Sequence, residues 1–187
     1  MAESAPRRVF FALWPPAETL SALDAVATET VRRCGGRRTR RDALHLTLAF
    51  IGVVTSARLD ALRNVAGRVR AEPFSFVLDR LGCWPRNRIV WTGCGAAPSA
   101  QNRLCATLAA RLAEAGFIID RRPFVPHVTL VRDARCDRLP ERTSPIPWRV
   151  GDFVLAESLL QPAGARYRLL GRWPLVAAPY KNLHECS

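Results

Sequence analysis

Lysine is almost absent from this chain of 187 residues, in which Lys and Arg together number 28 and Asp and Glu number 16. Lys181 is the one lysine, so arginine supplies nearly all of the positive charge behind the net charge of +12. Arginine can bind a phosphate through two parallel hydrogen bonds, and a strongly basic protein attracts polyanions. A genome rich in G and C would also enrich arginine, so composition alone leaves both explanations open.

Long apolar segments are missing as well. The first apolar run, residues 9–14, is six residues long and ends at a double proline. Such a run is too short for a signal peptide or a membrane span. We therefore expect a cytoplasmic protein without membrane contact, and the lack of heptad repeats favours a monomer.

Cysteine pairs with metal-binding spacing are absent too, although the chain holds six cysteines. None of them forms a Cys-x-x-Cys pair or directly neighbours a histidine, which argues against a zinc or redox site and against a disulfide framework. No carboxylate cluster suggests another metal site, so neither a metal nor a cofactor is predicted. The cysteines are expected to be free and mostly buried thiols, at positions 34, 83, 94, 105, 136 and 186.

What the chain does contain is a repeated motif, His-Leu-Thr-Leu at residues 45–48 and His-Val-Thr-Leu at residues 127–130. Each copy lies in an apolar run without helical spacing, which predicts a buried strand. Side chains alternate along a strand, so each His shares a face with the Thr two residues later. A single motif is best explained by a core histidine. Two of three histidines would match by chance in only about 1% of cases, so we interpret the pair as functional.

The remaining pattern predicts an α+β fold. Helices are expected over residues 16–33, 56–70 and 99–115, with Ser56 capping the second and Gly116 ending the third. Besides the motif strands, strands are expected at residues 9–14, 74–81, 88–94, 150–160 and 167–173, with a proline-rich loop at 139–147. The order of elements suggests two related halves. Residues 1–187 are interpreted as one two-lobed domain, because no linker interrupts them.

Three further stretches accompany the motifs. They are Arg-Val-Phe-Phe-Ala-Leu-Trp-Pro-Pro at residues 8–16, Arg-Pro-Phe-Val-Pro at residues 122–126, and a closing region that includes Glu157, Tyr167 and residues 172–175. Together these features resemble the two-histidine phosphoesterase superfamily, and within it the RNA 2′,3′-cyclic phosphodiesterases, also called 2′-5′ RNA ligases. The resemblance implies two pseudo-symmetric lobes of antiparallel-rich sheet, with helices outside and an active-site cleft between the lobes.

The resemblance also implies a reaction. Opening a cyclic phosphodiester with water requires a base for the water proton and an acid for the leaving oxygen, on opposite sides of phosphorus. Imidazole can serve in either role near neutral pH, and a Thr hydroxyl can donate to the phosphate oxygens. The resemblance assigns His45 as proton donor and His127 as proton acceptor, with Thr47 and Thr129 beside them. It implies a 2′-phosphate product and a reverse, 2′-5′ ligase reaction.

Other residues are candidates for substrate binding. Arg122 precedes His127 by five residues, and flanking prolines limit its directions, so it is either a phosphate ligand or a surface arginine. Phe11 and Phe124 are expected to contact the RNA, and Phe10, Phe50 and Trp84 are further candidates for stacking on a base. A core position is the alternative for each of the five. The arginines of residues 37–41 form either a phosphate-gathering loop or a solvated turn. His184, in a polar tail, is assigned no role.

These features predict an enzyme that acts on RNA ends with a 2′,3′-cyclic phosphate, tRNA fragments among them. Other cyclic or 2′-5′ linked nucleotides remain open as substrates. A non-catalytic RNA-binding module on the same fold is the alternative from a different class. Two titrating groups set opposite each other favour the enzyme, because binding alone requires neither of them.

Overall fold

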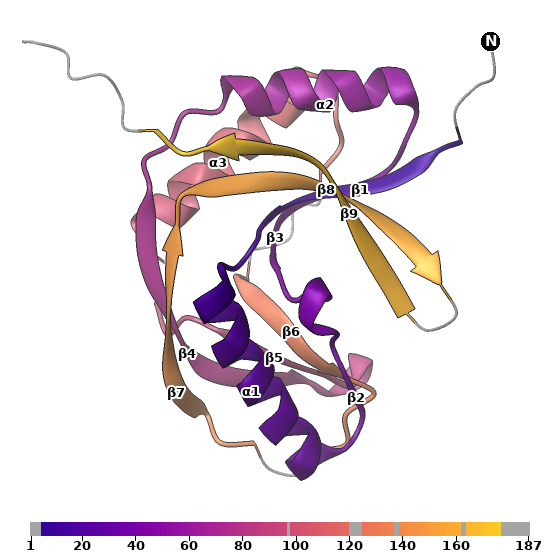
Figure 1. Cartoon of the computed structure of the whole chain (residues 1–187). Helices are drawn as coiled ribbons and strands as arrows, with labels where there is room; N and C mark the ends of the chain where they lie inside the picture. Colours follow the sequence, from indigo (N-terminus) through magenta and orange to yellow (C-terminus); the bar gives the residue numbers. More distant parts are fainter. Residues whose placement is uncertain (1–4, 97, 120–124, 137–138, 162–163, 177–187) are drawn as a thin grey trace, which may run out of the picture.

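The computed structural model describes residues 5–96, 98–119, 125–136, 139–161 and 164–176. A nine-stranded sheet forms its centre, with eight strands in the order β7-β4-β5-β6-β3-β1-β8-β9 and β2 paired with β6. The strand pairs are antiparallel throughout the described residues. The fold is therefore α+β with helices outside an antiparallel sheet, as the sequence predicts (Figure 1).

The sheet has two lobes, which adjoin at β3 and β6. The first lobe contains β1 (Arg7–Leu13), β3 (Leu46–Val54), β8 (Asp152–Gln161) and β9 (Gly164–Pro174). The second contains β4 (Phe74–Trp84), β5 (Ile89–Gly93), β6 (His127–Arg132) and β7 (Arg142–Val150), with β2 (Arg37–Arg38) beside β6. Each lobe combines strands from early and late in the chain, so the lobes are not the two halves of the sequence.

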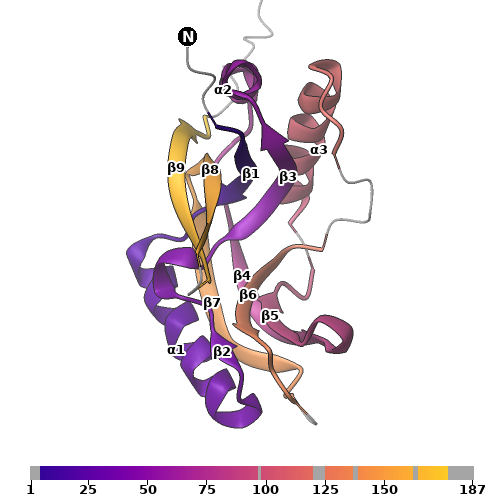
Figure 2. The same ribbon diagram turned by 90° about the vertical axis from the view of Figure 1, so that its right-hand side faces the viewer.

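The helices lie at opposite ends of the molecule. α1 (Ala17–Cys34) packs against β6 and β7, although it directly follows β1 in the chain. α2 (Ser56–Arg68) and α3 (Ser99–Glu114) lie beside each other and contact β9 and β3 respectively (Figures 1 and 2). Among the described residues, no helix is both long enough and apolar enough to cross a membrane.

The two motif strands alternate as the sequence predicts. Leu46, Val128 and Leu130 are fully buried, and Leu48 is 6% exposed. These side chains belong to one apolar cluster that includes residues of both lobes. The His and Thr of each motif therefore occupy the opposite, partly exposed face.

The proline-rich segment was predicted as a loop, and this prediction is wrong. Residues Arg142–Val150 form β7, in which Ile146 pairs with Leu78 and Pro147 pairs with Val77 of β4. β7 is the outermost strand on its side of the sheet. An edge strand tolerates proline because the missing N–H would face away from the neighbouring strand.

Helix boundaries differ slightly from the predicted ones. Thr55, not Ser56, is the N-cap of α2, and its hydroxyl accepts a hydrogen bond from the backbone N–H of Arg58 at 3.4 Å. This helix ends at Arg68, two residues before the predicted end. Gly116 follows the end of α3 with a φ of 72°, the left-handed conformation that favours glycine after a helix.

A disulfide joins Cys34 and Cys136, which corrects the prediction that all cysteines are free. Cys34 ends α1 and is followed by β2, which pairs with the end of β6 shortly before Cys136. This pairing brings the two Cα atoms to 4.6 Å across 102 residues of sequence. The free thiols of Cys83, Cys94 and Cys105 are half-buried, and Cys186 lies outside the described residues.

Reduction of this disulfide is expected to lower the free energy of unfolding by about 2–4 kcal/mol, because the link closes a loop of 102 residues in the unfolded chain. Urea unfolding of the wild-type protein with and without a reducing agent would measure the difference. Cys34→Ser should abolish the response to the reducing agent, and Cys83→Ser should retain it. Equal unfolding midpoints for the oxidised and reduced wild-type protein would contradict the prediction.

Candidate active site

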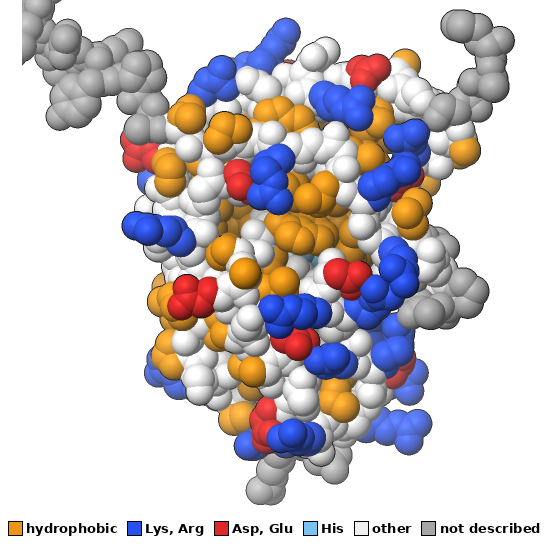
Figure 3. All heavy atoms as spheres, in the orientation of Figure 1, with side chains coloured by type: hydrophobic (Ala, Val, Ile, Leu, Met, Phe, Trp, Pro, Cys, Tyr) orange, Lys and Arg blue, Asp and Glu red, His pale blue; other side chains and the backbone are white. Residues whose placement is uncertain are grey.

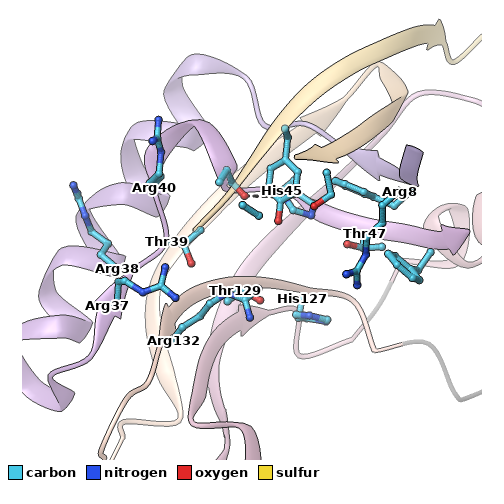
Figure 4. A pocket seen from close by; sticks show the side chains of 16 residues that line it. Arg8, Arg37, Arg38, Thr39, Arg40, His45, Thr47, His127, Thr129 and Arg132 are labelled. Carbon is cyan, nitrogen blue, oxygen red and sulfur yellow. Dashed lines mark hydrogen bonds between the residues drawn. The ribbon is translucent and has the colours of Figure 1, made fainter. Parts of the chain in front are cut away.

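A cavity of about 350 Å³ lies where β3 and β6 adjoin. Both motifs line it, with His45 and Thr47 on the β3 side and His127 and Thr129 on the β6 side (Figure 4). The structure thus brings together four side chains from two distant parts of the sequence. The two histidines are 82 residues apart, and so are the two threonines.

The strand register sets the order of these four side chains. Leu46 of β3 pairs antiparallel with Val128 of β6. In this register the residue before one partner lies beside the residue after the other. His45 is therefore placed beside Thr129, and Thr47 beside His127. Each imidazole has a hydroxyl from the opposite strand as its neighbour, on the face away from the core.

The two imidazoles are held in the same way. Nδ1 of His45 lies 2.8 Å from the carbonyl oxygen of Ala43, and Nδ1 of His127 lies 2.8 Å from that of Val125. A carbonyl oxygen can only accept, so Nδ1 carries the proton and donates it in both cases. In the neutral ring, Nε2 is then the basic nitrogen, and this atom is left for proton exchange with a substrate.

Aromatic side chains enclose both imidazoles, but the surroundings of the two differ. The ring of Trp14 stacks on His45 with an interplanar angle of 7° and a centroid distance of 5.4 Å. Phe10 and Tyr167 lie 4.8 and 4.9 Å from the same ring. His127 instead meets the edge of Trp84 at 4.5 Å. These contacts restrict the orientation of each ring and limit its contact with water.

Burial makes both imidazoles poor bases. Loss of hydration lowers the pKa of His45 to about 4 and also lowers the pKa of His127. The hydrogen bonds to the carbonyl oxygens oppose this effect, and the positive charge of Arg132 adds to it. Both side chains are thus neutral at pH 7, and an anionic phosphate held between them would raise both pKa values.

Arginines supply the positive charge around the cavity. Arg38 pairs with Asp24 at 2.7 Å, and Arg40 pairs with Asp42 at 2.6 Å, so much of the charge in this loop is compensated. Arginine side chains are also spread over the molecular face shown in Figure 3. Those that line the cavity are Arg8, Arg37, Arg38, Arg40 and Arg132.

A β-bulge in β6 directs Arg132 into the cavity. Trp91 pairs with Thr129, but the next pair is Val90 with Val131, so β6 has one extra residue at this point. Leu130 and Val131 are consequently both buried in succession. The alternation is thereby reversed, and Arg132 returns to the face that carries Thr129. Simple alternation from the sequence would have placed this arginine on the core side.

Phe11 was predicted to bind substrate, and this prediction is wrong. Its side chain is fully buried and packs against Phe153 and Trp173, at 6.1 and 6.2 Å between ring centroids. The preceding residue, Phe10, points to the other face of β1 and lines the cavity. In this strand the apolar residues occupy both faces, so the sequence did not indicate which phenylalanine faces the site.

The other predicted site residues, Arg122 and Phe124, lie outside the described residues, as does His184. Besides Arg132, the sequence analysis assigned no role in the site to Tyr167 or Thr39. Tyr167 lines the cavity beside His45, and the buried hydroxyl of Thr39 has no hydrogen-bond partner among the described residues. No group of three or more possible metal ligands occurs in the described part of the chain.

Comparison with known families identifies this arrangement. The family model described as LigT like Phosphoesterase matches residues 13–91 and 95–167. The first stretch contains the motif of His45, and the second contains that of His127. The chain belongs to the LigT-like phosphoesterase family. The paired motifs of this LigT-like phosphoesterase therefore account for the His-Thr cavity between its lobes.

Individual relatives of this LigT-like phosphoesterase support the same conclusion. The chain is 36% identical over 173 residues to the RNA 2′,3′-cyclic phosphodiesterase of Escherichia coli, covering 92% of this chain and 98% of the relative. Identity to the RNA 2′,3′-cyclic phosphodiesterase of Thermus thermophilus is 31%, with 90% of each chain covered. The crystal structure of E. coli LigT complexed with 3′-AMP matches with a TM-score of 0.84 at 36% identity, covering 92% of this chain and 100% of LigT.

The His45 imidazole is expected to titrate with a pKa of about 4 in the protein without bound anion, since burial disfavours its charged form. Inorganic phosphate should raise this value, because a nearby anion favours the imidazolium. NMR titration of the imidazole resonances would measure both values, with His45→Gln assigning the signal. A pKa near 6.5 that phosphate leaves unchanged would contradict the expectation.

Proposed function

We propose that this LigT-like phosphoesterase hydrolyses RNA 2′,3′-cyclic phosphodiester ends to 2′-phosphomonoesters, with His45 as proton donor and His127 as proton acceptor. The observation that carries the proposal is the pair of His-Thr sets on two adjoining strands of one cavity, with Nδ1 of each imidazole bonded to a backbone carbonyl. The E. coli and T. thermophilus relatives are named RNA 2′,3′-cyclic phosphodiesterases, which supports the same substrate.

In the proposed reaction, Nε2 of His127 removes a proton from water as the water oxygen attacks phosphorus. The bond from phosphorus to the ribose O3′ breaks, and the imidazolium of His45 gives its proton to that oxygen. A 2′-phosphate is left on the RNA. Proton exchange with solvent then returns His45 to its protonated form and His127 to its neutral form for the next cycle.

The charge of the substrate is part of this scheme. His45 must be protonated to act as an acid, yet burial lowers its pKa to about 4. The anionic phosphodiester would favour the imidazolium, so protonation and substrate binding should reinforce each other. Thr47 and Thr129 would donate hydrogen bonds to the non-bridging oxygens, and Arg132 would balance their charge. This scheme uses no metal ion.

RNA recognition extends the proposal beyond the phosphate. Tyr167 lies beside His45, is half-buried and lines the cavity, so it is suited to stack on the terminal base. Arg122 and Phe124 are retained as proposed contacts with the RNA. The enzyme is proposed to act as a monomer in the cytoplasm, where RNA ends such as those of tRNA fragments would be its substrates.

A short RNA with a 2′,3′-cyclic phosphate end, incubated with the protein and excess chelator, tests the proposal. His45→Ala and His127→Ala should each reduce turnover by a factor of about 10² to 10⁴, the usual contribution of a general acid or base. His184→Ala is the matched control. Full activity in either of the first two variants would refute the mechanism. Salt-dependent RNA binding without cleavage would indicate a binding module instead.

Arg132→Gln is expected to reduce kcat/KM about 100-fold, because it removes a charge-assisted contact to the phosphate of the transition state. Arg135→Gln is the matched control. This substitution removes the same charge three residues later, and Arg135 does not line the cavity. Steady-state kinetics of cyclic phosphate hydrolysis would measure the difference. Equal effects of the two substitutions would mean that overall charge, rather than a direct contact, is responsible.

A further inference from the structure

The antiparallel register of the motif strands gives the cavity a direction. Along β6 the chain runs from His127 to Arg132, whereas β3 runs in the opposite direction and begins directly after His45. The His45 side of the cavity therefore leads toward Arg132. In Figure 4, Arg37 and Arg132 lie at this end of the cavity, and Arg8 lies at the opposite end.

The proposed reaction places the ribose on the same side as these arginines. His45 protonates O3′, so the ribose that carries this oxygen lies on the His45 side of phosphorus, while water approaches from the His127 side. Tyr167, the proposed stacking partner of the base, also lies beside His45, at 4.9 Å between ring centroids. An RNA substrate therefore extends from the cyclic phosphate toward Arg132. Its next phosphate, on O5′ of the same nucleotide, comes to the arginine end of the cavity.

Two arginines face each other directly at this end of the cavity. Arg37 of β2 pairs antiparallel with Arg132 of β6, so the two side chains project from the same face of the strands. Both of them line the cavity. Like charges directly opposite each other destabilise a strand pair, and an anion bound between the two guanidinium groups would offset this repulsion. The pair is therefore suited to bind a phosphate.

The carboxylates around this end compensate Arg37 less than its neighbour Arg38. Arg38 makes a close ion pair with Asp24, at 2.7 Å. Arg37 makes a longer contact with Asp133, at 3.9 Å, and Asp133 lies nearer to Arg88, at 3.3 Å. The side chain of Arg37 is 58% exposed. Its guanidinium group can therefore turn to a phosphate and donate two parallel hydrogen bonds to it.

The backbone holds Arg37 beside β6 in the protein without substrate. The N–H of Thr39 donates to the carbonyl oxygen of Leu130 at 2.8 Å. On the other side of Arg37, Gly36 has a φ of 86°, and a Cβ at this position would lie 2.6 Å from the carbonyl oxygen of Arg132. A side chain at Gly36 would therefore separate β2 from β6. A contact that is preformed in this way costs less entropy on binding than one that must first be ordered.

We propose that Arg37, together with Arg132, binds the phosphodiester on the 5′ side of the terminal nucleotide of the RNA. The proposal rests on the function proposed above and narrows its substrate to RNA with an internal phosphodiester, in preference to a nucleoside 2′,3′-cyclic phosphate. Arg132 lies between the two phosphates and contributes to both, whereas Arg37 contacts only the second. Binding of the second phosphate fixes the position of the terminal ribose and directs its O3′ toward His45.

A set of related substrates separates this contact from the chemistry. Adenosine 2′,3′-cyclic phosphate has no second phosphate and reports the hydrolysis alone. A di-adenosine RNA with the same cyclic end adds the internal phosphodiester, and its methylphosphonate analogue keeps the linkage but removes the charge. Steady-state kinetics give kcat/KM for each substrate with the wild-type protein, Arg37→Gln and Arg33→Gln. Arg33 is the matched control because it is also exposed, lies four residues earlier and does not line the cavity.

The wild-type protein should hydrolyse the charged dinucleotide about tenfold more efficiently than the neutral one, in keeping with a hydrogen bond to a charged group. Arg37→Gln should abolish this preference and reduce the slope of log kcat/KM against log salt by about 0.7, the value for one phosphate contact on a single strand. Arg33→Gln should retain both. Equal kcat/KM values for the two dinucleotides in the wild-type protein, an unchanged preference in Arg37→Gln, or an equal loss in Arg33→Gln would overturn the contact while leaving the proposed hydrolase in place. Absence of hydrolysis of all these substrates by the wild-type protein would overturn both proposals.

Discussion

The backbone pairing of Leu46 with Val128 is the constraint on which the site depends. It joins the two lobes, buries one face of each motif and presents the His and Thr of both motifs on the other face. In the described residues the β3–β6 ladder contains no further register pair. A longer antiparallel ladder would keep the two strands side by side along their length. With this single pair the strands diverge, which leaves room for a substrate beside it.

The same burial that positions the imidazoles also opposes their charge. Both rings donate through Nδ1 to a carbonyl two residues earlier, so the backbone just before each strand fixes the tautomer as well as the orientation. His45 has the more enclosed position, among Phe10, Trp14 and Tyr167. A group that is protonated only when an anion is bound would couple proton transfer to the presence of the substrate.

The Arg-rich segment after α1 is held in place by three kinds of interaction. The disulfide fixes its start at Cys34, backbone pairing aligns Arg37 with Arg132, and the ion pair with Asp24 orients Arg38. The segment forms one wall of the cavity, although its arginine side chains are exposed to solvent. Arg37, Arg38 and Arg40 of this segment and Arg132 of β6 line the cavity together, and Asp24 and Asp42 compensate part of this charge.

The sequence by itself determined the α+β class, most helices and strands, and the faces of the two motif strands, because alternation and capping are local properties of the chain. Local pattern could not decide which phenylalanine of β1 faces the cavity, since Phe10 and Phe11 are equally apolar. It also could not reveal the bulge that turns Arg132 toward the site or the edge position that makes Pro147 acceptable in a strand. The Cys34–Cys136 disulfide and the pairing of Arg37 with Arg132 were decided only by the tertiary structure. Both depend on contacts between segments far apart in the chain, where sequence spacing carries no information about distance in space.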